Sequence, residues 1–346
     1  MEIGVYTFGD LPFGVCGSAA SRQRLQEIVA AARLADEAGL HVFGVGEHHR
    51  SDYAVSAHSV VLGAIAMVTQ RIRLTSAVTI LSSADPVRLY EEFATLDLLS
   101  GGRAEIMAGR GAFIESFPLF GFDLQDYNSL YEEKLELLLR LNREDRISWT
   151  GQHRAALHHA EVAPRALNGP MPVWIGAGGT PQSAVRAGQL GLPLNLANIG
   201  GQPAQFRPFI DLYRQTGLQA GHAPDQLKVA VSAHLHIHRD SQQAREHFYP
   251  HYKRYFKHNL PQRDRGWDMS RSDFEQLASP KGCLFVGSPQ EITDKILYEH
   301  ELFGHQRFLA QIDIGGLPYE QVAQSIELLA TRVLPEVQKA LGHPSV

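Results

Sequence analysis

Residues 3–45 contain the unit that decides the fold, a short apolar run, a longer segment and a second short run. The first run is Ile3-Gly4-Val5-Tyr6-Thr7-Phe8 and the second is Val42-Phe43-Gly44-Val45. Both are typical of buried strands. Between them, over residues 22–38, apolar residues recur at helical spacing, and Gly39 follows where a helix C-terminal cap is expected. The stretch therefore predicts strand, helix and strand in that order.

The same alternation repeats to the end of the chain. It predicts further strands over residues 72–81, 103–108, 172–176, 192–196, 227–238 and 307–312. It predicts further helices over residues 56–69, 86–99, 127–142, 181–188, 204–216 and 319–334. Strands that alternate with helices imply a parallel sheet with right-handed crossovers. Eight such units favour an α/β fold of the closed (β/α)8, or TIM-barrel, type over an open doubly wound sheet.

Two stretches depart from this repeat and are expected to be insertions on connecting loops. Residues 149–163 surround a Thr-Gly-Gln turn and suggest a small hairpin or an extended excursion. Residues 249–280 are polar and aromatic, and they suggest either a lid over the site or a surface excursion. No linker or internal repeat divides the chain. We therefore expect one domain over residues 1–346 with a possible lid insertion at 249–280.

Composition excludes several classes of function. The chain has 346 residues, 44% of them hydrophobic and 20% charged, which is typical of a globular protein. Lys and Arg number 32 against 37 Asp and Glu, so neither a nucleic acid nor an anionic membrane is an expected partner. The two cysteines, Cys16 and Cys283, offer no disulfide framework, which favours a reduced, cytoplasmic setting. No apolar stretch reaches the roughly 20 residues of a membrane span.

The residues that follow the second strand are candidates for catalysis. Active sites of such barrels lie at the C-terminal ends of the strands. Here the second strand is followed by Gly46-Glu47-His48-His49-Arg50. A carboxylate beside an imidazole can set its tautomer and pKa and so make it a general acid or base. A surface loop with solvated charges is the alternative.

Glycine clusters follow the fourth and fifth strands. The fourth strand ends in Gly109-Arg110-Gly111, and the fifth is followed by Gly178-Gly179-Thr180-Pro181 at the start of a helix. Arginine offers a planar fork for phosphate or carboxylate, and backbone N–H groups at a helix start bind phosphate. Each cluster alone is common in turns. Together, at strand ends of one barrel, they predict a site for a phosphorylated cofactor.

These motifs and several others occur in one order along the chain. The others are Leu74-Thr75-Ser76-Ala77-Val78, Asp85-Pro86-Val87-Arg88, Asp97-Leu98-Leu99-Ser100-Gly101-Gly102-Arg103 and Val286-Gly287-Ser288-Pro289. With Gly46-Glu47-His48-His49 and the Gly109-Arg110-Gly111 turn, they make the chain resemble the bacterial luciferase-like family of flavin-dependent monooxygenases and oxidoreductases. The resemblance runs nearly end to end.

The resemblance implies a barrel that binds reduced flavin mononucleotide (FMN) at its C-terminal mouth. It makes His48 the active-site histidine, with Glu47 beside it, and it places a non-prolyl cis peptide at Ala77-Val78 under the flavin ring. A glycine pair replaces side-chain contacts that luciferase itself makes at the phosphate loop. The residues that resemble the family's phosphate site are Arg110, Gly178, Gly179, Thr180, Gln182 and Ser183.

The resemblance implies a monooxygenase that uses reduced FMN and O2 on a small organic substrate. It also implies a separate flavin reductase that supplies the reduced flavin, and a homodimer. Two alternatives stay open: an oxidoreductase that transfers hydride with the deazaflavin F420, and a non-catalytic flavin-binding protein. Asn195 and Asn198, at the end of the sixth strand, are expected from their position to contact the ring edge or the substrate.

Histidine is abundant, with 17 residues, and three of them share one face of the seventh strand. His234, His236 and His238 alternate with apolar residues, so the period of two places their imidazoles together. Facing the barrel interior, they would suggest a metal-dependent hydrolase. No carboxylate partner is evident at the other strand ends. Facing the helices they would be structural, and no metal site is expected.

Overall fold

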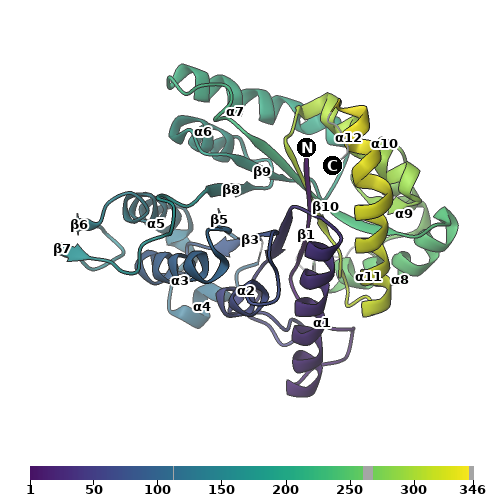
Figure 1. The fold of residues 1–346 in the computed structure, drawn as a ribbon, viewed down its shortest axis with the longest axis horizontal. Coiled ribbons are helices and arrows are strands. Elements are labelled where there is room, and N and C mark those ends of the chain that lie inside the picture. Colours follow the sequence, from purple (N-terminus) through teal and green to yellow (C-terminus); the bar gives the residue numbers. More distant parts are fainter. Residues whose placement is uncertain (112, 260–267, 343–346) are drawn as a thin grey trace.

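The computed structural model describes residues 1–111, 113–259 and 268–342 and shows a closed parallel barrel with helices around it (Figure 1). Eight of the described strands form the barrel, and the eighth pairs with the first to close it. The predicted (β/α)8 fold is therefore confirmed. In order around the barrel the strands are β1 (Glu2–Thr7), β2 (Val42–Val45), β3 (Arg73–Ser76), β5 (Ala104–Gly109), β8 (Val173–Ala177), β9 (Leu194–Ala197), β10 (Val229–Ile237) and β12 (Arg307–Gln311).

Within the described ranges, four short strands lie outside this ring. The predicted strand over 72–81 is divided, because β3 ends at Ser76 and β4 (Thr79–Ile80) pairs separately with β5. The strands β6 (Arg146–Trp149) and β7 (Leu157–Glu161) form an antiparallel hairpin, as residues 149–163 suggest. In Figure 1 this hairpin extends from the barrel beyond α5. The strand β11 (Phe285–Gly287), which the sequence did not predict, pairs with the end of β10.

Helices cover the outside of the barrel and connect the strands (Figure 1). The helix α3 (Pro86–Ser100) shows how the sequence sets its ends. The Asp85 side chain accepts hydrogen bonds from the N–H groups of Val87 and Arg88, and Pro86 lies in the first turn. Gly101, in the left-handed conformation, ends the helix. None of the helices in the described ranges is long and apolar enough to span a membrane. The helices are α1 (Ser18–Glu37), α2 (His58–Ala66), α3 (Pro86–Ser100), α4 (Ser116–Phe120), η1 (Leu124–Asp126), α5 (Tyr127–Leu141), α6 (Pro181–Leu190), η2 (Pro203–Phe206), α7 (Arg207–Gln219), α8 (Ser241–Asn259), α9 (Arg271–Ala278), α10 (Pro289–Phe303), α11 (Tyr319–Leu328), η3 (Leu329–Val333) and α12 (Leu334–Ala340).

Residues 249–280 are largely helical where the structure describes them. They include the second half of α8 and all of α9, while residues 260–267 lie outside the described part of the chain. The buried positions Ala244, Phe248 and Tyr252 are four residues apart, which is a helical stripe. Pro250 and several charged residues interrupt this stripe in the sequence. A lid role for the segment stays a prediction.

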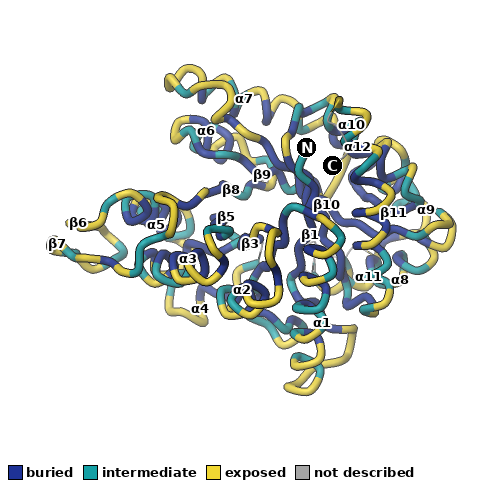
Figure 2. Tube along the Cα trace, in the orientation of Figure 1, coloured by how far each residue is buried: buried dark blue, intermediate teal, exposed yellow. Residues whose placement is uncertain are grey.

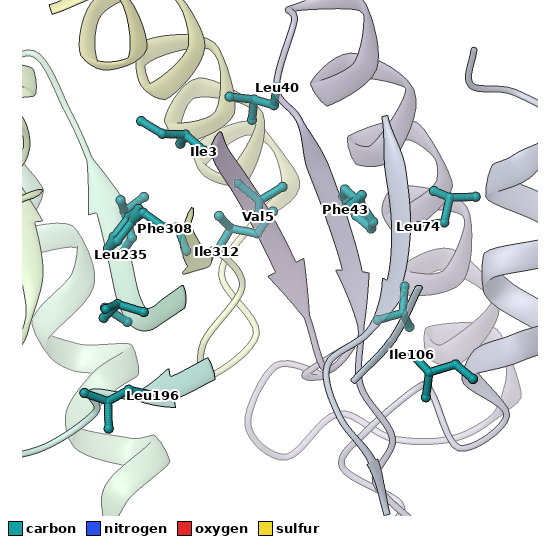
Figure 3. Packing of buried hydrophobic residues seen from close by; sticks show 14 of the residues in the cluster. Ile3, Val5, Leu40, Phe43, Leu74, Ile106, Leu196, Leu235, Phe308 and Ile312 are labelled. Atoms are coloured by element: carbon teal, nitrogen blue, oxygen red, sulfur yellow. The ribbon is translucent and has the colours of Figure 1, made fainter. Parts of the chain in front are cut away.

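The core has two layers. Outward-facing side chains such as Val5, Phe43 and Leu74 pack between the strands and the helices (Figure 3). A smaller inner cluster fills the barrel itself. Strands buried on both faces in this way are usual for a parallel barrel, and Figure 2 shows exposed positions confined largely to the outer helix faces and loops. The inner cluster contains Tyr6, Val42, Ala77, Met107, Trp174, Ala230 and Leu309.

A buried ion pair closes the floor of the barrel, at the N-terminal ends of the strands. The Arg307 guanidinium donates to Glu105 at 2.6 Å and to Glu2 at 2.8 Å, and it lies 4.4 Å from the centre of the Trp174 ring. Arg73 also reaches Glu105, at 3.1 Å. Burial lowers the pKa of Arg307, but the two carboxylates outweigh this effect and raise it. Since β12 and β5 lie on opposite sides of the ring, the pair bridges the barrel.

Replacing Glu105 with Gln removes the buried carboxylate that pairs with Arg307 and leaves only the half-exposed Glu2 to compensate its charge. We expect Glu105→Gln to lower the free energy of unfolding in urea by about 3–5 kcal/mol. Glu161→Gln is the matched control, because the Arg146–Glu161 pair is exposed on the hairpin and is expected to contribute less than about 1 kcal/mol. Equal losses in the two variants would contradict a special role for the floor.

Candidate functional site

The site at the barrel mouth is built around Val78. The Ala77–Val78 peptide bond is cis, which agrees with the resemblance. The Val78 side chain occupies space that side chains at two neighbouring strands would take. A Cβ at Gly109 would lie 2.6 Å from Val78 Cγ2, and one at Gly176 would lie 2.7 Å from Val78 Cγ1. Real Cβ atoms do not approach so closely, so a side chain at either position would force Val78 to shift.

His48 lies in the loop after β2, enclosed by aromatic rings. Its ring centroid lies 4.8 Å from that of Phe8, 4.3 Å from that of Tyr53 and 4.8 Å from that of Phe113. The imidazole is buried, its Nδ1 lies 3.2 Å from Glu115 Oε1, and its Nε2 has no partner in the described part of the chain. Burial lowers the pKa of His48, and the Glu115 carboxylate offsets part of that effect. The ring is therefore neutral at neutral pH, with one nitrogen free.

Glu47 forms hydrogen bonds with Ile80 and His49 and does not contact the His48 ring by a hydrogen bond. Its Oε1 accepts a hydrogen bond from the Ile80 N–H at 2.6 Å, and its Oε2 lies 3.0 Å from His49 Nε2. Although burial acts to raise the pKa of Glu47, hydrogen bonds from His49 and Ile80 hold it below its ordinary value. The carboxylate that contacts His48 is Glu115, which the sequence did not indicate. A catalytic role for Glu47 stays a prediction.

Arg110, after β5, is brought together with the predicted loop after β8. Its guanidinium donates to Thr180 Oγ1 at 3.2 Å, to Ser183 Oγ at 3.3 Å and to Asn128 Oδ1 at 2.8 Å. It also lies 5.3 Å from the centre of the Tyr127 ring. Sequence reasoning missed Asn128. The one sequence feature that could have indicated it is its place at the start of the predicted helix over residues 127–142.

The glycine pair after β8 places no side chain beside the Arg110 cluster. A Cβ at Gly178 would meet nothing within 4 Å, so the space beside it is free. Gly179 has a φ of +99°, and a Cβ there would lie 2.7 Å from the Phe206 ring, so both conformation and space require glycine. Thr180 precedes α6 and its side chain caps no N–H group of that helix. Gln182, in the first turn of α6, is exposed.

The two predicted asparagines point in different directions. Asn195 Oδ1 accepts a hydrogen bond from Ser232 Oγ at 2.9 Å. Asn198 donates from Nδ2 to Glu299 of α10 at 2.5 Å, which ties it to a surrounding helix. Burial raises the pKa of Glu299 to about 8. Contact of either asparagine with a substrate stays a prediction.

The histidines of β10 pack against α8. His234 Nδ1 lies 3.3 Å from the Tyr252 hydroxyl, and His236 stacks on Phe248 with 5.6 Å between ring centroids. Burial lowers the pKa of each to about 3. Within the described residues no three His, Cys, Asp or Glu side chains gather as metal ligands would. A structural role for these two histidines stays a prediction.

The barrel and its mouth define a class of enzyme. A buried neutral imidazole lies among aromatic rings, and a guanidinium with hydroxyl groups at a helix start is suited to a phosphate. Residues 1–306 match the family described as luciferase-like monooxygenase. The chain belongs to this family and is a flavin-dependent oxidoreductase, as the sequence predicts.

Known proteins resemble the chain over most of its length. The oxygenase component of the flavin-dependent trigonelline monooxygenase of Acinetobacter baylyi is 25% identical over 348 residues, which cover 91% of this chain and 90% of that protein. The structure of the monooxygenase RslO1 from Streptomyces bottropensis has a TM-score of 0.84 at 25% identity, with 97% and 99% of the chains covered. The F420-dependent tetrahydromethanopterin reductase of Methanopyrus kandleri, at 18% identity, shares the fold with a TM-score of 0.73 over 97% and 99%.

A methyl group placed beside Val78 should destabilise the protein at the barrel mouth. We expect Gly109→Ala to lower the free energy of unfolding by about 1–3 kcal/mol, because the new methyl group overlaps Val78. Gly178→Ala, where nothing lies within 4 Å, is the control and should leave stability near that of the wild type. Denaturant unfolding followed by circular dichroism measures both, and an undisturbed Gly109→Ala protein would refute the steric argument.

Proposed function

We propose that the chain is the oxygenase of a two-component flavin monooxygenase, which uses reduced FMN and O2 on a small organic substrate. One observation carries the choice of cofactor: Arg110, Thr180, Ser183 and Asn128 converge beside an open glycine loop. These groups come from two connections of the barrel, the one between β5 and β8 and the one between β8 and β9. The sequence had indicated only part of the set.

The residues present fit a flavin phosphate. Within the described residues, Arg110 donates side-chain hydrogen bonds to neutral groups, two hydroxyls and an amide oxygen, so its charge is available to an anion. The N-terminus of α6 adds the positive end of a helix dipole. Arg110, Thr180 and Ser183 would hold the phosphate, while Gly178 and Gly179 keep side chains out of its path.

FMN, when bound, supplies the redox chemistry with O2. The chain's own part is to bind, to exclude water and to move a proton. Val78 would support the flavin ring, since its backbone bond to Ala77 lies at the mouth between β3 and β4. His48 would accept a proton at Nε2, the ring nitrogen that has no partner. Phe8, Tyr53 and Phe113 would keep water from that nitrogen.

Coenzyme F420 is the second candidate, because a protein that depends on it shares this fold over nearly the whole chain. A competitive titration of reduced FMN against reduced F420 separates the two. A protein that binds FMN but consumes no O2 with any substrate would instead be a non-catalytic flavin-binding member.

A flavin reductase is the partner that this function requires. The trigonelline relative is called an oxygenase component, which supports a division of labour between two proteins. We place the chain in the cytoplasm, since its cysteines, the exposed Cys16 and the buried Cys283, are both unpaired. Recovery of the native protein from the membrane or exported fraction of its source cells would contradict this placement.

We also propose that the chain forms a homodimer through α2 and α3. Val60 on α2 and Met67 just after it are 71% and 67% exposed, and they are seven residues apart, which places them on one helix face. Leu98 and Leu99, at the end of α3, are also exposed. The two helices lie beside each other in Figure 1, so these apolar side chains fit a self-complementary surface.

Loss of the Arg110 guanidinium should weaken flavin binding. We expect Arg110→Ala to raise the Kd for FMN about 10- to 100-fold, because a charged hydrogen-bond donor to phosphate is removed. Fluorescence titration measures the affinity without turnover. Arg88→Ala, at an exposed position of α3, is the control. Unchanged affinity in Arg110→Ala would count against the assigned phosphate site.

A charge on the α2 surface should separate the dimer. We expect light scattering to give about twice the chain mass of 38.3 kDa for the wild type and the single mass for Val60→Glu. Leu218→Glu, on the exposed side of α7, is the matched control and should stay dimeric. A monomeric wild type would refute the proposal.

A further inference from the structure

We propose that Glu115 is the positioning residue of His48: its carboxylate fixes the proton on Nδ1 and leaves Nε2 as the proton acceptor. This inference rests on the proposed function for its catalytic meaning, but its structural claim does not. It assigns a task to a residue that lies 67 positions away from His48 in the sequence.

The chemistry of the pair sets the tautomer. An ionised carboxylate only accepts hydrogen bonds. Glu115 Oε1 lies 3.2 Å from His48 Nδ1, so that nitrogen must carry the proton. In a neutral imidazole the other nitrogen is then an acceptor, and Nε2 is buried without a partner in the described residues. Such an unsatisfied acceptor is available to a proton donor on a bound ligand.

The surrounding rings fix the plane of the imidazole but not its tautomer. Phe8 comes from the end of β1, Tyr53 from the β2 loop and Phe113 from the β5 loop, and they pack on the ring. Of these, only Tyr53 carries a titratable group. The charged groups that act on His48 are Glu115, Arg50 and Glu47. Only Glu115 is in hydrogen-bond contact with the ring.

Arg50 supports the carboxylate indirectly. Its guanidinium lies 5.2 Å from the centre of the Tyr53 ring and 5.3 Å from that of Phe113, so it lies over the residues that enclose His48. It is paired with Asp52 and donates to Asn259 at the end of α8 at 2.8 Å. Burial acts to raise the pKa of Glu115, but the hydrogen bond with His48 and the charge of Arg50 keep it below its ordinary value. Glu115 therefore stays ionised at neutral pH.

The direct test is the tautomer of His48 in the wild-type protein. Selective 15N-histidine labelling, with the His48 signals assigned by their loss in His48→Gln, reports which ring nitrogen carries the proton. We expect Nδ1–H in the wild type. A signal from Nε2–H would overturn the proposal, and this result does not depend on whether the chain binds flavin.

Glu115→Gln tests the functional consequence. We expect the pKa of His48, followed by NMR titration, to fall below its wild-type value, because the carboxylate that favours the imidazolium is gone. We expect turnover to fall about 10-fold or more, with the Kd for FMN within about twofold of wild type. Glu161→Gln is the matched control. An unchanged His48 pKa in Glu115→Gln would overturn the proposal.

A double-variant cycle separates this inference from the proposed function. If Glu115 acts through His48, then adding Glu115→Gln to His48→Gln lowers turnover no further. If Glu115→Gln lowers the turnover of the His48→Gln protein by the same factor as it lowers that of the wild type, Glu115 acts on a group other than His48. Failure of the wild type to bind FMN would refute the proposed function, while the NMR results would still decide the role of Glu115.

Discussion

The ion pair between Glu105 and Arg307 is the constraint on which the barrel depends. Two buried charges lose their hydration, so they are tolerated only where each is fully paired. Here the pair joins strands on opposite sides of the ring, and Glu2 of β1 completes it. Because Arg307 is also the register partner of Glu2, contacts at the floor set the height at which β12 and β1 emerge at the mouth.

The arrangement of residues at the barrel mouth depends on close steric contacts as well as on charge. The backbone between β3 and β4 projects Val78 toward β5 and β8, and these strands can approach only because they present Gly109 and Gly176 there. The same close approach brings the end of β5 beside the loop after β8. Arg110 follows Gly109 directly and therefore reaches Thr180 and Ser183. Steric constraint at one side chain thus places the Arg110 guanidinium at the proposed phosphate site.

The sequence predicted those features that a short stretch of residues encodes by itself. Eight strands, the glycine clusters and Arg110 follow from hydrophobic period and from residues next to strand ends. Glu115 and Asn128 did not, because their partners are distant in the chain and neither residue lies at a predicted strand end. The helical second half of α8 was missed for a different reason: its buried stripe through Tyr252 is carried by aromatic residues set among charges and a proline, so its period is weak.

Burial alone does not make a histidine reactive. Burial also lowers the pKa of His234 and His236, to about 3, and no carboxylate offsets the effect. Such rings stay neutral and are poor bases. At His48 the same loss of hydration is opposed by Glu115, so the ring stays neutral while Nε2 keeps part of its basicity. Of the buried imidazoles His48, His234 and His236, only His48 combines a free nitrogen with a carboxylate on the other, which is the arrangement that proton transfer requires.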